Sequence, residues 1–138
     1  MAARDVFHQA VKQALITDGW TITDDPLMVR FGGVDLYIDL GAEKLIAAEK
    51  EGTIIAVEVK SFLGASIVSE FHTALGQFLN YRFALHQKDP TRELFLAVPL
   101  DIYHTFFSLT FTQGVMLQHD VKLLIYHPEK QEIYQWIK

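Results

Sequence analysis

Residues 53–60 read Thr-Ile-Ile-Ala-Val-Glu-Val-Lys, an apolar run that charged residues interrupt only near its end. A nearly continuous apolar strand rich in β-branched residues is typical of the centre of a sheet covered on both faces. Because side chains alternate along a strand, Glu58 and Lys60 share one face. Burying two charges there is costly unless each is paired or holds a metal. This strand is therefore the predicted centre of the fold and of any chemistry.

A hairpin is predicted immediately before this strand. The apolar run 45–48 and the strand 53–60 flank the polar segment Glu49-Lys50-Glu51-Gly52. Two apolar runs around a short loop that contains glycine are typical of paired antiparallel strands.

The register of this hairpin decides which acid lies beside Glu58. A two-residue turn at the loop would place Glu43 opposite Lys60, and opposed residues project to the same face. Asp39 has the same parity, and a bulge at Gly41 would turn it inward instead. The sequence predicts an acidic neighbour from Glu43 or Asp39 and leaves both open.

The remaining periodicity predicts helices on both sides of a sheet. Helices are expected over residues 3–18, 65–87 and 100–117, and extended segments over 20–23, 28–31, 34–40, 93–98, 121–126 and 131–137. This order predicts a mixed α/β fold, with helices flanking a central mixed sheet. A chain of 138 residues fits one domain, here residues 1–138.

Composition narrows the classes of function. The absence of cysteine excludes disulfides, thiolate zinc sites and cysteine nucleophiles. A net charge of −5 disfavours a protein that grips DNA through a basic surface alone. Residues 1–5 lack the basic and apolar regions of a signal peptide, and no apolar run approaches the roughly 20 residues of a membrane span. We therefore expect a soluble cytoplasmic protein without a membrane partner.

An acid on one strand beside Glu-x-Lys on the next predicts metal chemistry. Two carboxylates bind a hard cation such as Mg²⁺ or Mn²⁺ through oxygen. Lys60 could orient a metal-held water and help to deprotonate it for attack on a phosphodiester. This is the layout of the PD-(D/E)XK nucleases. The alternative interpretation is a solvent-facing ion pair at the end of a strand.

The sequence also closely resembles the XisH family, the fdxN-element excision controlling factors found mostly in cyanobacteria. The resemblance lies in residues 5–8 (DVFH), 18–23 (DGWTIT), 35–50 (DLYIDLGAEKLIAAEK), 55–62 (IAVEVKSF) and 135–137 (QWI). It implies a restriction-endonuclease-like PD-(D/E)XK core and control, with a partner called XisI, of the site-specific excision of a DNA element during heterocyst development.

Two further sets of residues follow from this resemblance. Several such nucleases carry a Gln-x-x-x-Tyr motif on the helix after the Glu-x-Lys strand, which Gln77 and Tyr81 match; an ordinary amphipathic helix with a wet face is the alternative. Many also carry a glutamate on the first helix, where this chain has Asp5 and His8. The six histidines show no metal-ligand spacing, and surface or capping roles are expected for all of them.

Three functions remain open from the sequence. The first is a Mg²⁺- or Mn²⁺-dependent endonuclease in which Glu58, Lys60 and Gln77 are catalytic. The second is an inactive regulatory subunit of the same fold that acts through an XisI-like partner, and the third is a domain whose charged pair is incidental. The acidic charge and the missing first-helix glutamate favour the second, whereas the intact Glu-x-Lys favours the first. The sequence leaves open whether the chain binds DNA directly or forms a homo-oligomer.

Overall fold

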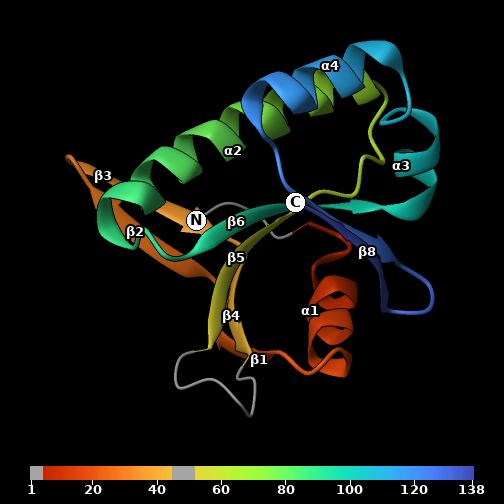
Figure 1. Ribbon diagram of the computed structural model, residues 1–138. Coiled ribbons are helices and arrows are strands. Elements are labelled where there is room, and N and C mark those ends of the chain that lie inside the picture. The colour runs from red at the N-terminus through yellow and green to blue at the C-terminus, as the bar shows by residue number, and fades with distance from the viewer. Residues whose placement is uncertain (1–4, 45–51) are drawn as a thin grey trace.

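The computed structural model describes residues 5–44 and 52–138, and its core is a six-stranded sheet between two layers of helix (Figure 1). The strands are β1 (Thr21–Asp24), β2 (Leu27–Phe31), β3 (Val34–Ile38), β4 (Leu40–Lys44), β5 (Thr53–Val59), β6 (Glu93–Pro99), β7 (Leu123–His127) and β8 (Glu132–Ile137). The helices are α1 (His8–Thr17), α2 (Ile67–Lys88), α3 (Leu100–Thr105) and α4 (Thr110–His119).

The main sheet has the order β1-β4-β5-β6-β7-β8. Its three central strands, β5, β6 and β7, run parallel, and the strands at either edge pair antiparallel. Helices α2, α3 and α4 cover one face and α1 covers the other (Figure 1). The mixed α/β fold predicted from the sequence is confirmed.

Strand β5 lies inside the sheet, as its apolar sequence predicts. Ile55, Val57 and Val59 face the core under α1, whereas Ala56 faces the core under α2. Glu58 follows on the α2 face and is only 5% exposed. The strand therefore carries an ionisable group into the interior.

Helix α2 follows its predicted bounds closely. It begins after Ser66, whose side chain accepts a hydrogen bond from the backbone N–H of Ser69 at 3.2 Å, as an N-cap does. It ends before the Asp89-Pro90 pair, where proline cannot continue a helix. Phe71 and Phe78 anchor its buried face to the sheet.

Three predicted elements have different bounds in the structure. Within the described residues the first helix begins at His8, because Asp5 forms a turn with Phe7 instead. The helix expected over 100–117 is broken between α3 and α4, where Phe106 and Phe107 turn into the core. The extended segment 34–40 is also divided, because the chain passes from the two-stranded β2–β3 sheet to the main sheet at its end.

The predicted hairpin register is wrong. Strand β4, which pairs with β5, ends at Lys44, and the run 45–48 lies outside the described residues. Glu43 is opposite Ile54, and Leu40 is opposite Val57. Glu43 therefore lies about 13 Å along the sheet from Glu58, at roughly 3.3 Å for each of the intervening strand positions.

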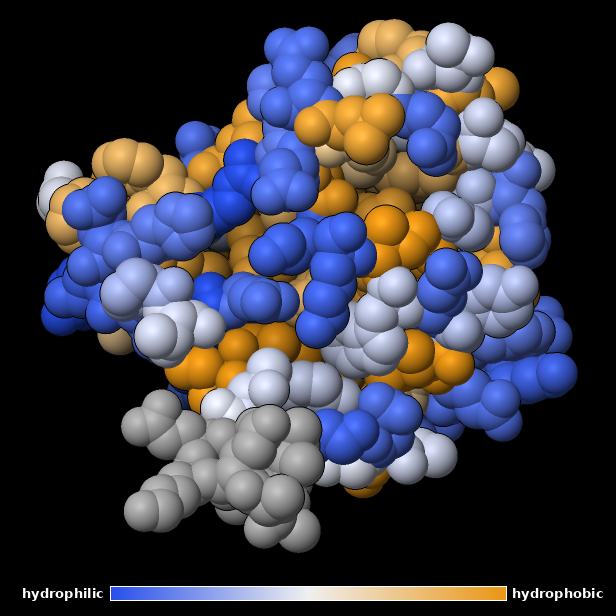
Figure 2. Space-filling view, viewed as in Figure 1, coloured by the Kyte–Doolittle hydropathy of each residue, from blue (hydrophilic) through white to orange (hydrophobic). Residues whose placement is uncertain are grey.

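The surface of the protein is mixed in polarity. On the face in Figure 2, hydrophilic residues are interspersed with small apolar groups. Among residues 5–44 and 52–138, no helix combines the length and apolar character that a membrane span requires.

Tyr126 provides a test of how β7 supports the end of β5. Its side chain is fully buried, and its hydroxyl donates to the backbone carbonyl of Lys60 at 3.1 Å. We expect Tyr126→Phe to lower the free energy of unfolding by about 1 kcal/mol, because the carbonyl loses its donor without a change in packing. Urea denaturation measures this. Tyr134→Phe is the matched control, since Tyr134 is exposed and its hydroxyl forms no hydrogen bond to the described residues; equal effects of the two changes would contradict the assignment.

Candidate functional site

Glu58 and Lys60 meet at the carboxyl end of β5. The Lys60 Nζ atom lies 3.6 Å from Glu58 Oε2, and the two side chains are 23% and 6% exposed. Lys60 also lines a hollow of about 260 Å³ with Asp5, Ser69 and Glu70. The carboxyl ends of parallel strands are where open α/β sheets bind their ligands. The pair is therefore partly enclosed and does not extend into open solvent.

Asp39, not Glu43, is the acid that the structure brings to Glu58. Asp39 lies between β3 and β4, and its backbone N–H donates to Glu58 Oε1 at 3.2 Å. Its Oδ2 atom accepts a hydrogen bond from the backbone N–H of Val59 at 2.7 Å. The two carboxyl groups are thus held together by the backbone of adjacent strands.

The electrostatics of this pair favour a cation. Burial, followed by the negative charge of Asp39, raises the pKa of Glu58 from 4.5 to about 8, although Lys60 acts in the opposite direction. Glu58 therefore retains a proton near neutral pH when no cation is bound. A divalent cation between the carboxylates would remove their repulsion and favour the ionised form.

Helix α2 places Tyr81 near the same carboxylates. The pKa of Tyr81 rises to about 12 because of burial and then the charges of Glu58 and Asp39, which places its hydroxyl in their field. Gln77 lies one turn earlier on the same face. Its Oε1 atom is buried without a hydrogen-bond donor among the described residues. Both side chains are partly buried, so this helix face is neither fully wet nor fully enclosed.

His8 is buried, which corrects the expectation of a surface role. It is 3% exposed, and its Nε2 atom lies 2.7 Å from Asp25 Oδ1. Lys12 Nζ is 2.7 Å from the other oxygen of Asp25. Burial opposes ionisation of Asp25, but its partners Lys12 and His8 outweigh burial and lower its pKa. The Nδ1 atom of His8 lies 3.9 Å from Asp39 Oδ1, at the edge of the site.

Asp25 and Lys12 were missed by sequence reasoning. The Asp24-Asp25-Pro26 stretch has the composition of a turn, which hid the role of Asp25. Asp5, by contrast, has a structural role. Its two oxygens accept hydrogen bonds from the backbone N–H groups of Phe7 and Ser61, both at 2.9 Å, so Asp5 ties the start of the chain to the end of β5.

The donor set fits a hard cation with few protein ligands. In the described part of the chain, no three His, Asp or Glu side chains are already arranged around one metal position. Asp39 and Glu58 supply two adjacent carboxylates, and Mg²⁺ commonly takes one or two carboxylates with water and substrate in the other positions. The buried, unpartnered Gln77 Oε1 adds a polar atom with no internal use.

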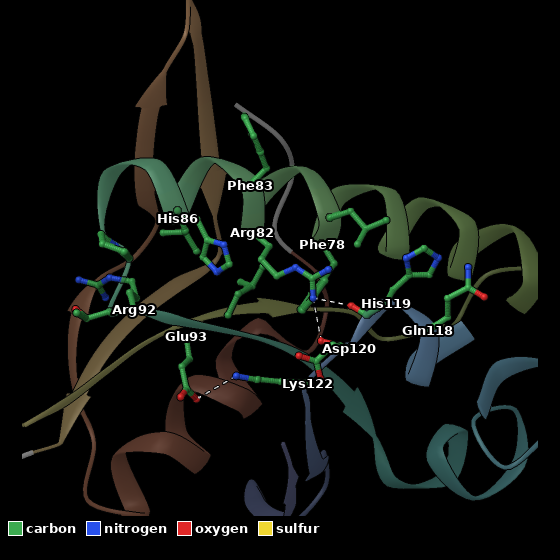
Figure 3. Close-up of a pocket in the computed structure, with 15 residues that line it drawn as sticks. Phe78, Arg82, Phe83, His86, Arg92, Glu93, Gln118, His119, Asp120 and Lys122 are labelled. Atoms are coloured by element: carbon green, nitrogen blue, oxygen red, sulfur yellow. Dashed lines mark hydrogen bonds and ion pairs between the residues drawn. The ribbon is translucent and has the colours of Figure 1, made fainter. Parts of the chain in front are cut away.

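A second cavity, of about 820 Å³, lies at the opposite end of the parallel strands (Figure 3). It is bounded by the second half of α2, the end of α4 and the starts of β6 and β7. Its basic side chains Arg82 and Lys122 already have partners within the protein. Arg82 Nη1 donates to the carbonyls of His119 and Asp120 at 2.7 and 2.9 Å, and Lys122 pairs with Glu93 at 3.9 Å. These contacts close the end of α4, and the cavity lacks the paired carboxylates of the first site.

The fold and site define a class: a mixed α/β protein with a buried carboxylate–lysine cluster at the carboxyl end of its central strand. The family model described as XisH protein matches residues 1–134, and the chain belongs to the XisH family.

Two solved structures are close relatives in fold and sequence. The chain is 55% identical to an XisH family protein from Nostoc punctiforme PCC 73102, with a TM-score of 0.89 over 97% of this chain and 100% of that one. It is 54% identical to an fdxN element excision controlling factor protein from Anabaena variabilis, with a TM-score of 0.88 over 98% and 100% of the two chains. No curated protein matches the chain.

The raised pKa of Glu58 predicts a pH-dependent stability in metal-free protein. Between about pH 4.5 and 8 the unfolded chain ionises this group while the folded chain keeps the proton, so its contribution to stability falls as pH rises. Glu58→Gln removes this slope. We expect the stability of the variant relative to wild type to rise from pH 5 to pH 8, by a few kcal/mol at most, since a tenfold change in proton affinity corresponds to about 1.4 kcal/mol.

Urea denaturation in the presence of a chelator measures this difference. Glu43→Gln is the control, because Glu43 lies away from the buried pair and should follow wild type at both pH values. A Glu58→Gln difference that does not change with pH would show that Glu58 is ionised in the folded protein throughout the range.

Proposed function

We propose that this protein is a divalent-metal-dependent DNA-processing factor of the restriction-endonuclease-like, PD-(D/E)XK type, which acts in the excision of a DNA element. The observation that carries the proposal is the cluster at the end of β5. There Asp39 donates its N–H to Glu58, and Lys60 lies 3.6 Å from the same carboxyl group. Two adjacent carboxyl groups that could hold a divalent cation, with a lysine beside them, suit cation-assisted phosphodiester hydrolysis.

Each residue has a distinct role in the proposed reaction. Asp39 and Glu58 would hold Mg²⁺ or Mn²⁺, which supplies charge stabilisation and lowers the pKa of a bound water. Lys60, with its Nζ beside Glu58, orients that water and stabilises the negative charge that develops during attack. Gln77 presents its unpartnered amide from α2, and Tyr81 closes the site from the same helix face.

The role in excision is supported by the relative from Anabaena variabilis, which is described as an fdxN element excision controlling factor protein. The net charge of −5 supports a role for an additional subunit in binding DNA. A chain with this charge has little general attraction for DNA phosphates, so we propose that an XisI-like partner supplies most of the affinity for DNA.

A second candidate is a regulatory subunit that does not cleave. The first turn of α1 contains no acidic residue, so it lacks the glutamate that many nucleases of this fold place near the metal. In this alternative the same fold serves as a surface for the partner, and the buried cluster takes no part in cleavage.

A cleavage assay with defined variants tests the proposal. With Mg²⁺ or Mn²⁺ and an XisI-like partner, we expect wild-type protein to cut DNA and the isolated chain to cut weakly. Lys60→Ala should abolish cleavage but retain metal binding, because a lysine ammonium is not a metal ligand. Glu58→Ala should lose both properties, since it removes a ligand.

The choice of acid is tested in the same preparations. Titration with Mn²⁺ should show a loss of affinity for Asp39→Asn and none for Glu43→Gln, because only Asp39 contacts Glu58. Absence of cleavage by wild type with the partner, together with unchanged partner binding by Lys60→Ala and Glu58→Ala, would identify the regulatory subunit instead.

A further inference from the structure

The outward face of helix α4 carries exposed apolar side chains in a stretch of sequence without charged residues. Phe111 and Leu117 are 55% and 81% exposed. The chain has no Asp, Glu, Lys or Arg between Asp101 and Asp120. Apolar surface lies over α4 at the top of the view in Figure 2. A grouping of exposed apolar side chains on a surface is typical of an interaction site.

A glycine lies at the centre of this face. Successive residues of a helix are about 100° apart, so Gly114 lies opposite the buried Thr112 and Met116. Phe111 and Leu117 flank it, each about 60° to one side. A Cβ atom at Gly114 would meet nothing within 4 Å among the described residues, so packing within the chain does not require glycine there. Glycine inside a helix lowers stability relative to alanine, and the close approach of a second backbone would account for it.

We propose that α4 forms the contact between two copies of this chain, which pack their outward faces antiparallel about a two-fold axis at Gly114. The proposed contact does not depend on the metal site. Each copy has a net charge of −5, which opposes association. Two such copies therefore meet best through a surface without charge, and residues 102–119 provide one.

The spacing of the flanking side chains fits this two-fold axis. Phe111 precedes Gly114 by three residues, and Leu117 follows it by three. In an antiparallel pair, residues equally far before and after the axis lie at the same level. Phe111 of each copy therefore meets Leu117 of the other. Because the two side chains lie on opposite sides of the line through the glycines, they pack side by side without collision, and the face is self-complementary, as an isologous contact must be.

The area of the contact indicates how tightly the two copies bind. Helix α4 has 10 residues, so it is about 15 Å long. A stable interface buries about 800 Å² on each partner, which is more than one face of so short a helix offers. We therefore expect a dimer that dissociates on dilution, with monomer prevailing at about 1 μM and dimer at several hundred micromolar.

Cross-linking of single-cysteine variants tests this geometry, because the chain has no cysteine of its own. For helix axes about 8–10 Å apart, the two Gly114 Cα atoms lie within about 6 Å of each other, which a disulfide can span. We expect Gly114→Cys to form a covalent dimer on mild oxidation at high protein concentration. Gly76→Cys is the matched control and should form at least about tenfold less. Gly76 is also helical with open space for a Cβ, but it lies on the face of α2 opposite Phe71 and Phe78.

Sedimentation velocity measures the association of protein without a cross-link. Leu117→Glu places like charges at the contact in both copies and should weaken dimerisation at least about tenfold. The exposure of Leu117 means that the variant should fold as wild type, which far-ultraviolet circular dichroism checks. Val34→Glu is the control, since it adds the same charge at an exposed apolar position on the β2–β3 hairpin, far from α4 in Figure 1; it should associate as wild type.

The outcomes decide between a second copy and other occupants of this face. Wild-type protein that remains monomeric at several hundred micromolar overturns the proposal, as does equal cross-linking by Gly114→Cys and Gly76→Cys. A dimer that Leu117→Glu leaves unchanged overturns it as well. If wild type is monomeric and Leu117→Glu loses binding to the additional subunit, the face belongs to that subunit and the second copy is excluded. Each readout is independent of metal binding and DNA cleavage.

Discussion

A buried ionisable carboxyl group lies on a central strand of this protein, and several distant segments are arranged around it. Glu58 is 5% exposed, between parallel β6 on one side and the junction before β4 on the other. Isolated burial of a charge is costly, so each neighbour has to compensate for it. The Asp39 backbone supplies a hydrogen bond, Lys60 supplies a positive charge, and Tyr81 of α2 lies near the group.

Asp39 links the architecture of the chain to this site. It is the residue at which the chain leaves the β2–β3 sheet and joins the main sheet, and its N–H and Oδ2 bind across to Glu58 and Val59. A residue at such a junction has no regular strand partner, which frees its backbone and side chain for these contacts. The same change of sheet therefore fixes one carboxylate beside the other.

The two ends of the parallel strands differ in the kind of polar group they gather. At the amino ends, Arg82 closes the end of α4, and Lys122 pairs with Glu93, whose Oε2 atom is buried without a hydrogen bond among the described residues (Figure 3). At the carboxyl end of β5, His8 Nδ1 and Gln77 Oε1 are buried without hydrogen-bond partners among the described residues. Polar atoms that folding buries but does not pair are typical of a site that a ligand completes. The adjacent carboxyl groups of Asp39 and Glu58 beside Lys60 direct the functional proposal to the carboxyl end.

The sequence by itself determined the features that depend on neighbouring residues. Strand alternation placed Glu58 and Lys60 on one face, and the helical period together with Asp89-Pro90 delimited α2. Only the tertiary structure decided which of Asp39 and Glu43 lies beside Glu58, because the pairing of β4 with β5 sets the register and composition does not specify it. It also decided the contact of His8 with Asp25, 17 residues apart, which exists because α1 packs beside the turn before β2. Local periodicity sets which way a side chain points along its own element, whereas the packing of elements decides what that side chain meets.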